Sequence, residues 1–256
     1  MSTPLKNKRV ALTRPDNESL AKKLKALGAE IIDMPLTEIA FDSSDNIDIL
    51  SEIGHYSVIC FTSANGVEGF FKHFFKKYTD IRCIGAAALA CVGKATSEAL
   101  AKFYLETDIM PTVHNGESLA QAIMEHRDIE NEKILVVCGS LSKEELPKIL
   151  QEKGNAIVDT YQVYSTIKKE SQTLEDAMFS FVNEGADAII FMSPSAVEVF
   201  ADNMEKFVLS KKARKPKTLS IGSTTSSAMR KLGIPLSAEA KEATEDSLVD
   251  AIINLI

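Results

Sequence analysis

The chain has 256 residues, of which 45% are apolar and 25% are charged, as in ordinary globular proteins. Its formal net charge of −7 and its pI near 5.3 argue against a nucleic-acid-binding surface, which needs a basic footprint. A small anion can still bind where hydrogen-bond donors gather locally. The length allows one large domain or two small ones.

Neither a membrane span nor a secretory signal is predicted, because no apolar run is long enough and the N-terminal residues lack an apolar core segment. We therefore expect a cytoplasmic protein. The four cysteines are scattered, without Cys-x-x-Cys spacing: Cys60, Cys83, Cys91 and Cys138. We interpret them as small core residues in a reducing compartment, and not as metal ligands or disulfide partners.

Strands and helices alternate along the first half of the chain. Residues 10–13 read as a buried strand, residues 20–27 as a helix that stops at Gly28, and residues 29–34 as a second strand. Such a βαβ unit crosses over right-handed into a parallel pair. Further predicted segments are a polar loop over 41–54 with a short helix at 48–53, a buried strand from 58, a helix at 65–77, a strand at 87–92, a helix at 96–104, an edge strand at 109–111 and a helix at 119–125.

The same pattern restarts near residue 133. It predicts a strand at 133–138, a helix at 143–153, a strand at 156–161, a polar stretch at 165–172, a helix at 174–184, a strand, turn and helix over 188–201, an exposed basic loop at 211–217 and a strand at 218–221. Matching pieces recur at offsets of 124–130 positions. We therefore predict a tandem duplication that builds an α/β protein of two similar, doubly wound parallel-sheet domains.

The clearest repeat is a strand, a hydroxyl-rich turn and the start of a helix. Residues 58–71 align with residues 188–201 at an offset of 130 and share six of fourteen residues. A strand that ends on hydroxyl side chains before a helix leaves free backbone N–H groups at the positive end of the helix dipole. Such a corner can bind an anion.

Ligands of open parallel sheets bind outside the carboxyl ends of the strands. Six corners rich in Ser, Thr, Asn and Gly are predicted there, at 62–66, 93–97, 115–118, 193–195, 222–227 and 244–247. Ordinary helix capping explains any one of them. Because all six occur without a nucleotide-binding glycine motif or an acidic metal cluster, we favour an anion-binding cleft between the two domains that uses neither nucleotide nor metal.

Few residues are suited to acid–base catalysis. The four histidines are isolated, and we expect surface roles for them: His55, His73, His114 and His126. No arrangement of Ser, His and Asp typical of hydrolases is present. Tyr161 and Tyr164 stand together, and a phenol there can donate a proton or a hydrogen bond to a departing hydroxyl. An ordinary strand aromatic is an equally good interpretation of Tyr164.

Several short pieces, taken in order, resemble the uroporphyrinogen-III synthase family over essentially the full length. They are Ala-Leu-Thr-Arg-Pro at 11–15, Phe-Thr-Ser-Ala-Asn-Gly-Val at 61–67, Val-Gly-Lys-Ala-Thr-Ser-Glu-Ala at 92–99, Val-Tyr at 163–164, Ser-Pro-Ser-Ala-Val at 193–197 and Ile-Gly-Ser-Thr-Thr-Ser-Ser-Ala at 221–228. The resemblance implies a discontinuous domain of residues 1–37 and 165–256, a second domain of residues 38–164, and a two-stranded connector formed by 35–39 and 162–166. The repeat alone would divide the chain near residue 130.

The resemblance also implies a reaction. Hydroxymethylbilane, a linear tetrapyrrole with eight carboxylates, loses water from its terminal hydroxymethyl group, closes into a ring and inverts its last pyrrole. No cofactor or metal is expected. The implied partners are this small-molecule substrate and, transiently, the upstream enzyme that forms the bilane. We expect a monomer without nucleic-acid or membrane partners.

The resemblance implies that Tyr164 assists the departure of the hydroxyl as a hydrogen-bond donor or acid. Substrate-binding roles are implied for residues of the matching motifs: Arg14, Thr62, Ser63, Asn65, Gly66, Thr96, Ser193, Pro194, Ser195, Gly222, Thr224 and Thr225. Pro194 has no counterpart in the first corner, where Ala64 stands, so the two corners are expected to contact the ligand differently.

Two other functions fit parts of the sequence. A noncatalytic two-lobed module that binds a small anion, such as a sensory or solute-binding protein, is the main alternative. The expected lack of a signal peptide and of a basic DNA-binding element disfavours it. A sugar-phosphate isomerase or transferase on the same fold would need a clearer acid–base pair.

Overall fold

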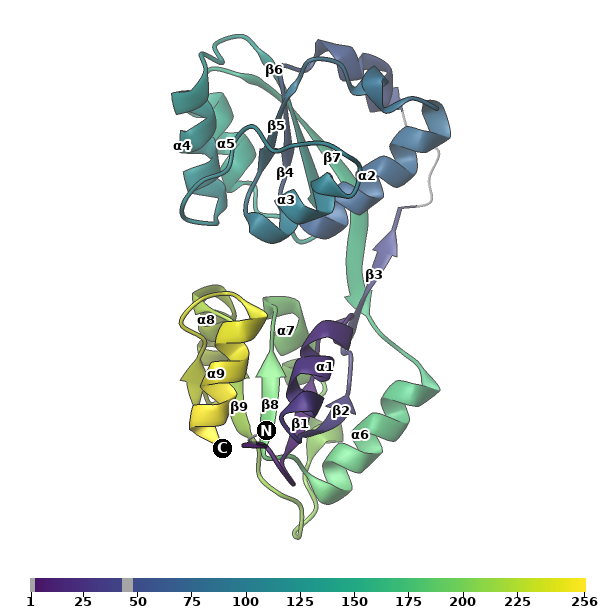
Figure 1. The fold of residues 1–256 in the computed structure, drawn as a ribbon, viewed down its shortest axis with the longest axis vertical. Helices are drawn as coiled ribbons and strands as arrows, with labels where there is room; N and C mark the ends of the chain where they lie inside the picture. The colour runs from purple at the N-terminus through teal and green to yellow at the C-terminus, as the bar shows by residue number, and fades with distance from the viewer. Residues whose placement is uncertain (1–2, 43–47) are drawn as a thin grey trace. The chain divides into compact units, whose positions relative to one another are not determined.

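The structure, a computed structural model, describes residues 3–42 and 48–256. The chain forms two compact units. Unit 1 comprises Met1–Glu38 and Ile167–Ile256, and unit 2 comprises Ile39–Thr166 (Figure 1). The domain bounds after residues 37 and 164 that the resemblance implies stay a prediction.

Unit 1 is a five-stranded sheet with helices on both faces. Its elements are β1 (Arg9–Leu12), α1 (Glu18–Ala26), β2 (Glu30–Asp33), α6 (Gln172–Glu184), β8 (Ala188–Phe191), α7 (Pro194–Asp202), the 3₁₀ helix η3 (Met204–Phe207), β9 (Lys217–Ser220), α8 (Ser223–Lys231), β10 (Ala238–Glu239) and α9 (Glu245–Leu255). The strand order is β10, β9, β8, β1, β2, and each neighbouring pair is parallel.

The core of unit 1 lies on both faces of this sheet. All four residues of β1 are buried, because this strand pairs with β2 on one side and with β8 on the other. Ala11 clusters with side chains of α6, α7 and α8, whereas Val10 and Leu12 cluster with those of α1 and α9. Successive strand residues point to opposite faces, so one short strand contributes to both halves of the core.

Unit 2 has the same layered arrangement. Its elements are β3 (Thr37–Phe41, which begins in unit 1), the 3₁₀ helix η1 (Asp48–His55), β4 (Val58–Phe61), α2 (Ala64–Lys77), the 3₁₀ helix η2 (Ile81–Ile84), β5 (Ala88–Cys91), α3 (Lys94–Ala101), α4 (Gly116–His126), β6 (Lys133–Gly139), α5 (Glu145–Glu152) and β7 (Ile157–Lys168). The strand order is β3, β7, β6, β4, β5. The edge strand predicted at 109–111 is reduced to one parallel bridge between Ala90 and Ile109.

Aromatic side chains fill one face of the sheet in unit 2. Phe70 and Phe71 of α2 pack with Phe61 of β4, and the ring centroids of Phe61 and Phe70 lie 5.4 Å apart. The neighbouring Cys60 belongs to the core on the other face, together with Leu119 of α4. The predicted α/β class with two doubly wound, mostly parallel sheets is confirmed.

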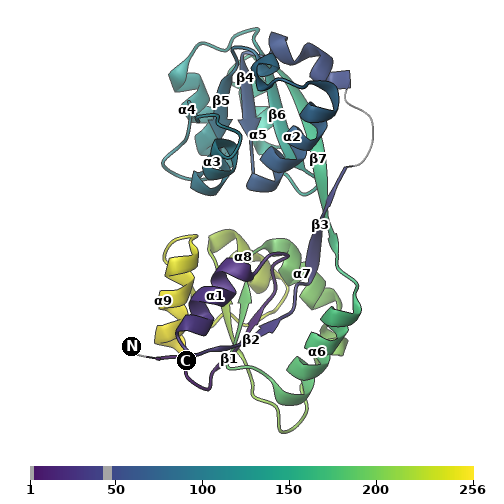
Figure 2. The ribbon, with the colours of Figure 1, turned by 45° about the vertical axis from the view of Figure 1, so that its right-hand side comes forward.

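The strand β7 is longer than the sequence indicates. Its predicted end is residue 161, but it continues to Lys168 because β3 lies beside it (Figure 2). Two backbone hydrogen bonds join the edges of this pair, Asp42 N–H to Val163 O at 3.0 Å and Lys169 N–H to Leu36 O at 3.1 Å. Residue numbers rise along one strand as they fall along the other, so the pair is antiparallel. The strand therefore includes the connector segment at 162–166 and the first four residues of the polar stretch at 165–172.

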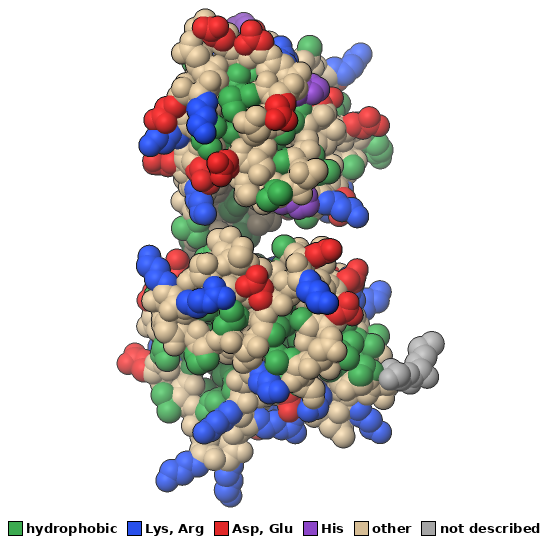
Figure 3. Space-filling view, turned by 90° about the vertical axis from the view of Figure 1, so that its left-hand side faces the viewer, with side chains coloured by type: hydrophobic (Ala, Val, Ile, Leu, Met, Phe, Trp, Pro, Cys, Tyr) green, Lys and Arg blue, Asp and Glu red, His purple; other side chains and the backbone are tan. Residues whose placement is uncertain are grey.

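Two loop predictions have different outcomes. The basic loop over 211–217 is exposed, and Figure 3 shows Lys and Arg side chains projecting from the end of unit 1 at the bottom of that view. The polar loop predicted over 41–54 lies partly on residues 43–47, outside the described residues. Within the described part of the chain, no helix is long and apolar enough to cross a membrane.

Candidate active site

The central strands of each unit mark a switch point of the chain. In unit 2, β6 and β4 are neighbours. The chain runs from β6 through α5 to β7 on one side of this pair, and from β4 through α2 to β5 on the other side. In unit 1, β1 and β8 have the same relation. Parallel sheets bind ligands in the crevice outside the carboxyl ends of such strand pairs. The predicted corners at Ser63 and Ser193 follow β4 and β8 directly.

These two corners have the same local geometry. Ser63 has φ −162° and ψ 160°, and its Oγ accepts a hydrogen bond from Gly66 N–H at 3.0 Å. Ser193 has φ −154° and ψ 151°, and its Oγ accepts from Ala196 N–H at 3.2 Å. Both serines are therefore N-caps, as the capping interpretation predicts. A cap satisfies one N–H group of the first turn and leaves others available to an anion.

The corners differ in their backbone donors. Pro194 is the first residue of α7 and has no N–H group, whereas Ala64 in the same place in α2 has one. Ser195 partly compensates, because its hydroxyl lies 3.0 Å from Ser193 Oγ and adds a side-chain donor to the first turn. The two corners are thus chemically unequal, and unequal contacts with the ligand stay a prediction.

The second pair of corners is built on Gly93 and Gly222, which precede α3 and α8 and cap them without a side chain. Thr96 and Thr225 are each only 3% exposed, so their side chains are enclosed within the first turns of these helices. Thr224 is exposed. The donors that these turns present to solvent therefore include backbone N–H groups and, in α8, the hydroxyls of the exposed Ser223 and Thr224.

The third pair of corners caps α4 and α9. The Asn115 side chain accepts from Ser118 N–H at 2.8 Å, and the Thr244 hydroxyl accepts from Ser247 N–H at 3.2 Å. The residue before Asn115 is His114, whose Cγ lies 2.9 Å from the position that a Cβ atom would take at Gly93. Sequence reasoning treats His114 as an isolated surface histidine. The structure places its exposed ring beside the N-terminus of α3, and its position directly before a predicted corner is the signal that could have indicated this.

Tyr164 is brought next to Ser63. The Tyr164 hydroxyl lies 3.0 Å from Ser63 Oγ, and its half-buried ring packs against the aromatic core of unit 2. Thr62 is held at the same strand end, where its Oγ1 donates to Val137 O at 3.0 Å. A phenol, a serine hydroxyl and the N-terminus of α2 therefore meet at the carboxyl ends of β4 and β6. Asn65 and Gly66 form the first turn of this helix.

Arg14 follows the end of β1 in unit 1. Its Nη2 donates to Glu245 Oε1 at 3.3 Å, and its Nε donates to the carbonyl oxygen of Asp16. Glu245 stands in the first turn of α9. The guanidinium thus lies near the carboxyl edge of the sheet in unit 1, but one of its N–H groups is already paired with the Glu245 carboxylate.

The surface role expected for His73 is wrong. This side chain is 1% exposed, with Nδ1 2.6 Å from the Tyr161 hydroxyl and Nε2 2.7 Å from the backbone oxygen of Asp42. A carbonyl oxygen only accepts, so in the neutral imidazole Nε2 carries the hydrogen and Tyr161 donates to Nδ1. Burial, with a smaller contribution from the negative charge of Asp42, raises the pKa of Tyr161 to about 12.

Among residues 3–42 and 48–256, no group of three or more His, Cys, Asp or Glu side chains could hold a metal ion. A cavity of about 460 Å³ opens elsewhere in unit 1, near the start of α6. Leu36, Lys168 and Met178 are among the residues that line it, and none of the predicted site residues does.

Residues 18–250 match the model of a family described as uroporphyrinogen-III synthase HemD. The chain belongs to this family. The predicted resemblance is therefore confirmed, and so is the hydro-lyase class that the family name denotes.

Relatives in the uroporphyrinogen-III synthase family match nearly the whole chain. The porphyrin biosynthesis protein HemD of Ruminiclostridium josui is 30% identical over 261 aligned residues, which cover 100% of this chain and 50% of that protein. This chain thus spans half the length of that relative. The uroporphyrinogen-III synthase of Chlorobaculum parvum is 26% identical over 230 residues, which cover 89% of this chain and 90% of the relative.

Solved uroporphyrinogen-III synthases share the fold. The Helicobacter pylori structure matches with a TM-score of 0.67 at 14% identity and covers 97% of this chain and 100% of its own. A mutant Thermus thermophilus structure matches with a TM-score of 0.64 at 16% identity, covering 95% and 96%. At such low identity, the likeness supports the architecture and not the roles of individual residues.

Proposed function

We propose that this protein cyclises hydroxymethylbilane to uroporphyrinogen III with loss of water. Membership of the uroporphyrinogen-III synthase family over residues 18–250 supports this reaction. The observation that carries the proposal is the Tyr164 hydroxyl, which lies 3.0 Å from Ser63 Oγ beside the N-terminus of α2. A phenol in this position is a suitable acid for the departing hydroxyl.

The first step is the loss of water. The C–O bond of the hydroxymethyl group breaks, and its electron pair leaves on oxygen. Tyr164 transfers its proton to that oxygen, so the leaving group departs as water, while the pyrrole nitrogen supplies electrons to the carbon. The resulting azafulvenium loses its N–H proton to solvent, and solvent returns a proton to the phenolate. The ring then closes with inversion of the last pyrrole, for which the protein mainly controls the shape of the chain.

The carboxylates of the substrate bind at helix N-termini in this proposal. The donors are backbone N–H groups of the first turns of α2, α3, α4, α7, α8 and α9, and each of these helices follows a strand or bridge of a parallel sheet. The proposed binding residues are Arg14, Thr62, Ser63, Asn65, Gly66, Thr96, Ser193, Pro194, Ser195, Gly222, Thr224 and Thr225. The enclosed side chains of Thr96 and Thr225 shape their turns, so their backbone groups are the proposed contacts.

The reaction is redox-neutral, because it removes water and rearranges C–C bonds, so the proposal includes no redox cofactor. We further propose that the protein acts in the cytoplasm as a monomer and receives its unstable substrate from the upstream bilane-forming enzyme. Neither proposal depends on the role given to Tyr164.

Product isomers provide the test. Hydroxymethylbilane is generated enzymatically in the presence of the protein, and the oxidised products are separated by chromatography into isomers I and III. We expect isomer III to predominate and to form in proportion to protein concentration. If isomer I forms in the amount seen without protein, the chain is not a synthase. Saturable binding of the bilane without isomer III would instead support the noncatalytic anion-binding module.

A further inference from the structure

An irregularity in strand pairing brings Tyr164 to its position. β6 and β7 pair in regular register from Lys133 to Cys138, which pairs with Gln162, but Gly139 pairs with Tyr164. Val163 is therefore an extra residue on β7, which makes this a β-bulge. Bulges change the direction in which the following side chain points and are frequent next to active sites. As a result, both Val163 and Tyr164 contact the aromatic core of unit 2, instead of pointing to opposite faces.

Gly139 leaves the space that the Tyr164 ring occupies. A Cβ atom built on Gly139 would lie 2.3 Å from Tyr164 Cζ and 2.5 Å from Cε2, far closer than any real contact. Cζ is the ring carbon that bears the hydroxyl. The backbone of Gly139 is not in the left-handed region, which among the described glycines holds only Gly28, Gly85, Gly185 and Gly233. Space, and not backbone conformation, is thus the reason for a glycine at this position.

Ser63 holds the other end of the same phenol. Its Oγ accepts from Gly66 N–H, so the Ser63 hydroxyl hydrogen is available to donate to the Tyr164 oxygen 3.0 Å away. Accepting one hydrogen bond strengthens a hydroxyl as a donor of the next. In that arrangement Tyr164 accepts from Ser63, and its own hydrogen is free for the substrate. The chain of donors therefore runs from the N-terminus of α2 through Ser63 to Tyr164.

We propose that Ser63 and Gly139 are positioning residues for the acid of this reaction: Gly139 fixes where the Tyr164 hydroxyl lies, and Ser63 directs its hydrogen and stabilises the oxygen when the proton leaves. This inference rests on the proposed function. The inference adds two roles to that function. Ser63 positions Tyr164 as well as contacting the substrate, and Gly139, which has no side chain to contact the substrate, positions Tyr164 by leaving space for its ring.

The experiment is a double-mutant cycle read in kcat for isomer III. We expect Ser63→Ala to lower kcat about tenfold, the range of a hydrogen bond to a developing charge, and Gly139→Ala to lower it about 100-fold, as expected for an acid misplaced by about 1 Å. In the Tyr164→Phe background Gly139→Ala should lower kcat no further, and the loss from Ser63→Ala should shrink to what its contact with the substrate contributes, because the hydroxyl on which both act is missing. A merely structural role would give the same loss in both backgrounds, and that result would overturn the inference.

Two further variants separate positioning from capping. Ser63→Thr keeps a hydroxyl that can cap α2 and donate to Tyr164, so we expect it to restore most of kcat. Ser171 caps α6 with nearly the same geometry, φ −161° and ψ 153°, and accepts from Leu174 N–H at 3.2 Å, but it belongs to unit 1 and is not one of the proposed site residues. Ser171→Ala should lower the melting temperature about as much as Ser63→Ala and leave kcat unchanged. If Ser171→Ala lowered kcat as much as Ser63→Ala, loss of helix stability alone would explain the effect of Ser63→Ala, and the positioning role of Ser63 would be refuted.

The inference and the proposed function fail in different ways. Wild-type protein that forms no isomer III removes the function. If the wild-type protein forms isomer III and Tyr164→Phe retains full kcat, the proposed function stands. The role of Tyr164 as the acid and the roles of its positioning residues are then refuted. If Ser63→Ala lowers kcat equally with and without the Tyr164 hydroxyl, Tyr164 remains the acid but Ser63 is not a positioning residue.

Discussion

At the scale of single residues, Tyr164 combines a structural part and a chemical part that can be separated. Its ring packs over Gly139 and the aromatic core, and its hydroxyl contacts Ser63. The ring contacts do not depend on the oxygen. A change that removes the oxygen alone therefore tests the chemistry without disturbing the packing.

We predict that Tyr164→Phe lowers kcat for isomer III about 100-fold, because general acid catalysis contributes at least that much when the acid is well placed. The free energy of unfolding should change by less than about 1 kcal/mol, since a single half-buried hydrogen bond is lost. Isomer-resolved kinetics and urea unfolding measure the two quantities. Turnover at the wild-type level would remove Tyr164 as the acid.

The buried hydrogen bond between Tyr161 and His73 makes a prediction about alkaline pH. Burial raises the pKa of Tyr161 to about 12, above the value of about 10 expected in the unfolded chain. Between these values the unfolded chain binds fewer protons than the folded one, so the stabilisation is complete below pH 10 and is lost as the pH rises toward 12. We expect the wild type to lose more unfolding free energy than Tyr161→Phe between pH 9 and pH 11.5. Equal losses in urea titrations would contradict this.

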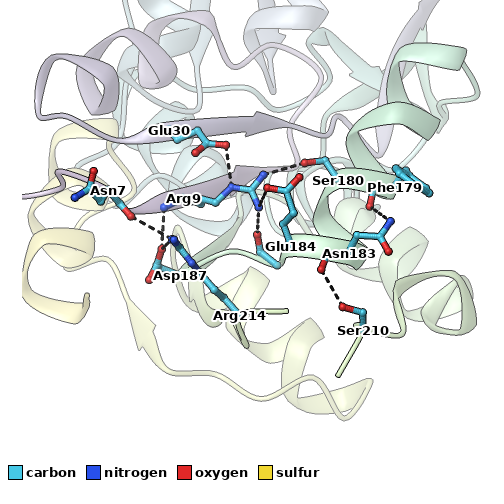
Figure 4. Close-up of polar contacts among 11 residues, drawn as sticks. Asn7, Arg9, Glu30, Phe179, Ser180, Asn183, Glu184, Asp187, Ser210 and Arg214 are labelled. Carbon is cyan, nitrogen blue, oxygen red and sulfur yellow. Dashed lines mark hydrogen bonds and ion pairs between the residues drawn. The ribbon is translucent and has the colours of Figure 1, made fainter. Parts of the chain in front are cut away.

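At the scale of secondary-structure elements, a buried arginine joins the strands and a helix of unit 1 at the amino end of β1 (Figure 4). Arg9 is 5% exposed. Its guanidinium donates to three groups, each at 2.8 Å: Glu30 Oε1 on β2, Ser180 Oγ on α6 and the backbone oxygen of Gly185, the residue after α6. The planar fork of arginine reaches all three at once, which lysine cannot do.

We predict that Arg9→Met lowers the free energy of unfolding by about 2 kcal/mol. The hydrogen bonds to Gly185 and Ser180 are lost. No buried carboxylate is left unpaired, because the side chains of Glu30 and Glu184, which both pair with Arg9, are 62% and 65% exposed. The cost therefore stays below the 3–5 kcal/mol typical of a broken buried ion pair. Urea unfolding measures it. Arg82→Met is the matched control, since the pair of Arg82 with Asp80 is exposed and should contribute little. Equal effects of the two changes would show that burial of Arg9 does not matter.

A second carboxylate beside Arg9 gives a prediction at acid pH. Partial burial alone would raise the pKa of Asp187, but hydrogen bonds from the backbone N–H of Arg9 and from Arg214 hold it below its ordinary value. A depressed pKa means stability that is present above the unfolded value and is lost as the pH falls through the folded one. We expect Asp187→Asn to destabilise unit 1 at pH 7 and to have a smaller effect near pH 3. An effect that does not change with pH would contradict this.

At the scale of the whole molecule, each unit draws on both halves of the duplicated sequence. In unit 1, β1 from the first half pairs with β8 from the second, and in unit 2, β4 from the first half pairs with β6 from the second. Both hydrophobic clusters of unit 2 consist of residues between 49 and 164. The segment that forms unit 2 therefore contains its complete core.

We predict that residues 39–166 expressed alone unfold cooperatively, because this segment keeps both clusters and the strands β4 to β7. A fragment of residues 1–130, which contains one whole sequence repeat, should not fold, because β1 lacks β8 and β4 lacks β6. Thermal unfolding followed by circular dichroism distinguishes them. A cooperative transition in the 1–130 fragment alone would favour the division near residue 130 and refute the discontinuous one.

Local chemistry made much of this structure predictable from sequence. The caps Ser63 and Ser193, the buried strands that precede them and the duplication depend on residue types at short spacing, so they can be recognised without knowing the fold. The burial of His73 could not be predicted in this way. Its partners Tyr161 and Asp42 are far along the chain, and an apolar spacing pattern does not show which polar side chain on a helix will find them.

By itself, then, the sequence determined the α/β class, the repeated corners and their order along the chain, because helical and strand periods and N-caps act over a few residues. The tertiary structure decided which copy of each strand pairs with which, since β1 and β6 have similar patterns and either could accept a parallel neighbour. It also decided the bulge that sets Tyr164 opposite Gly139 and beside Ser63. That contact depends on the register of two strands, which is set only when the sheet and α2 pack together.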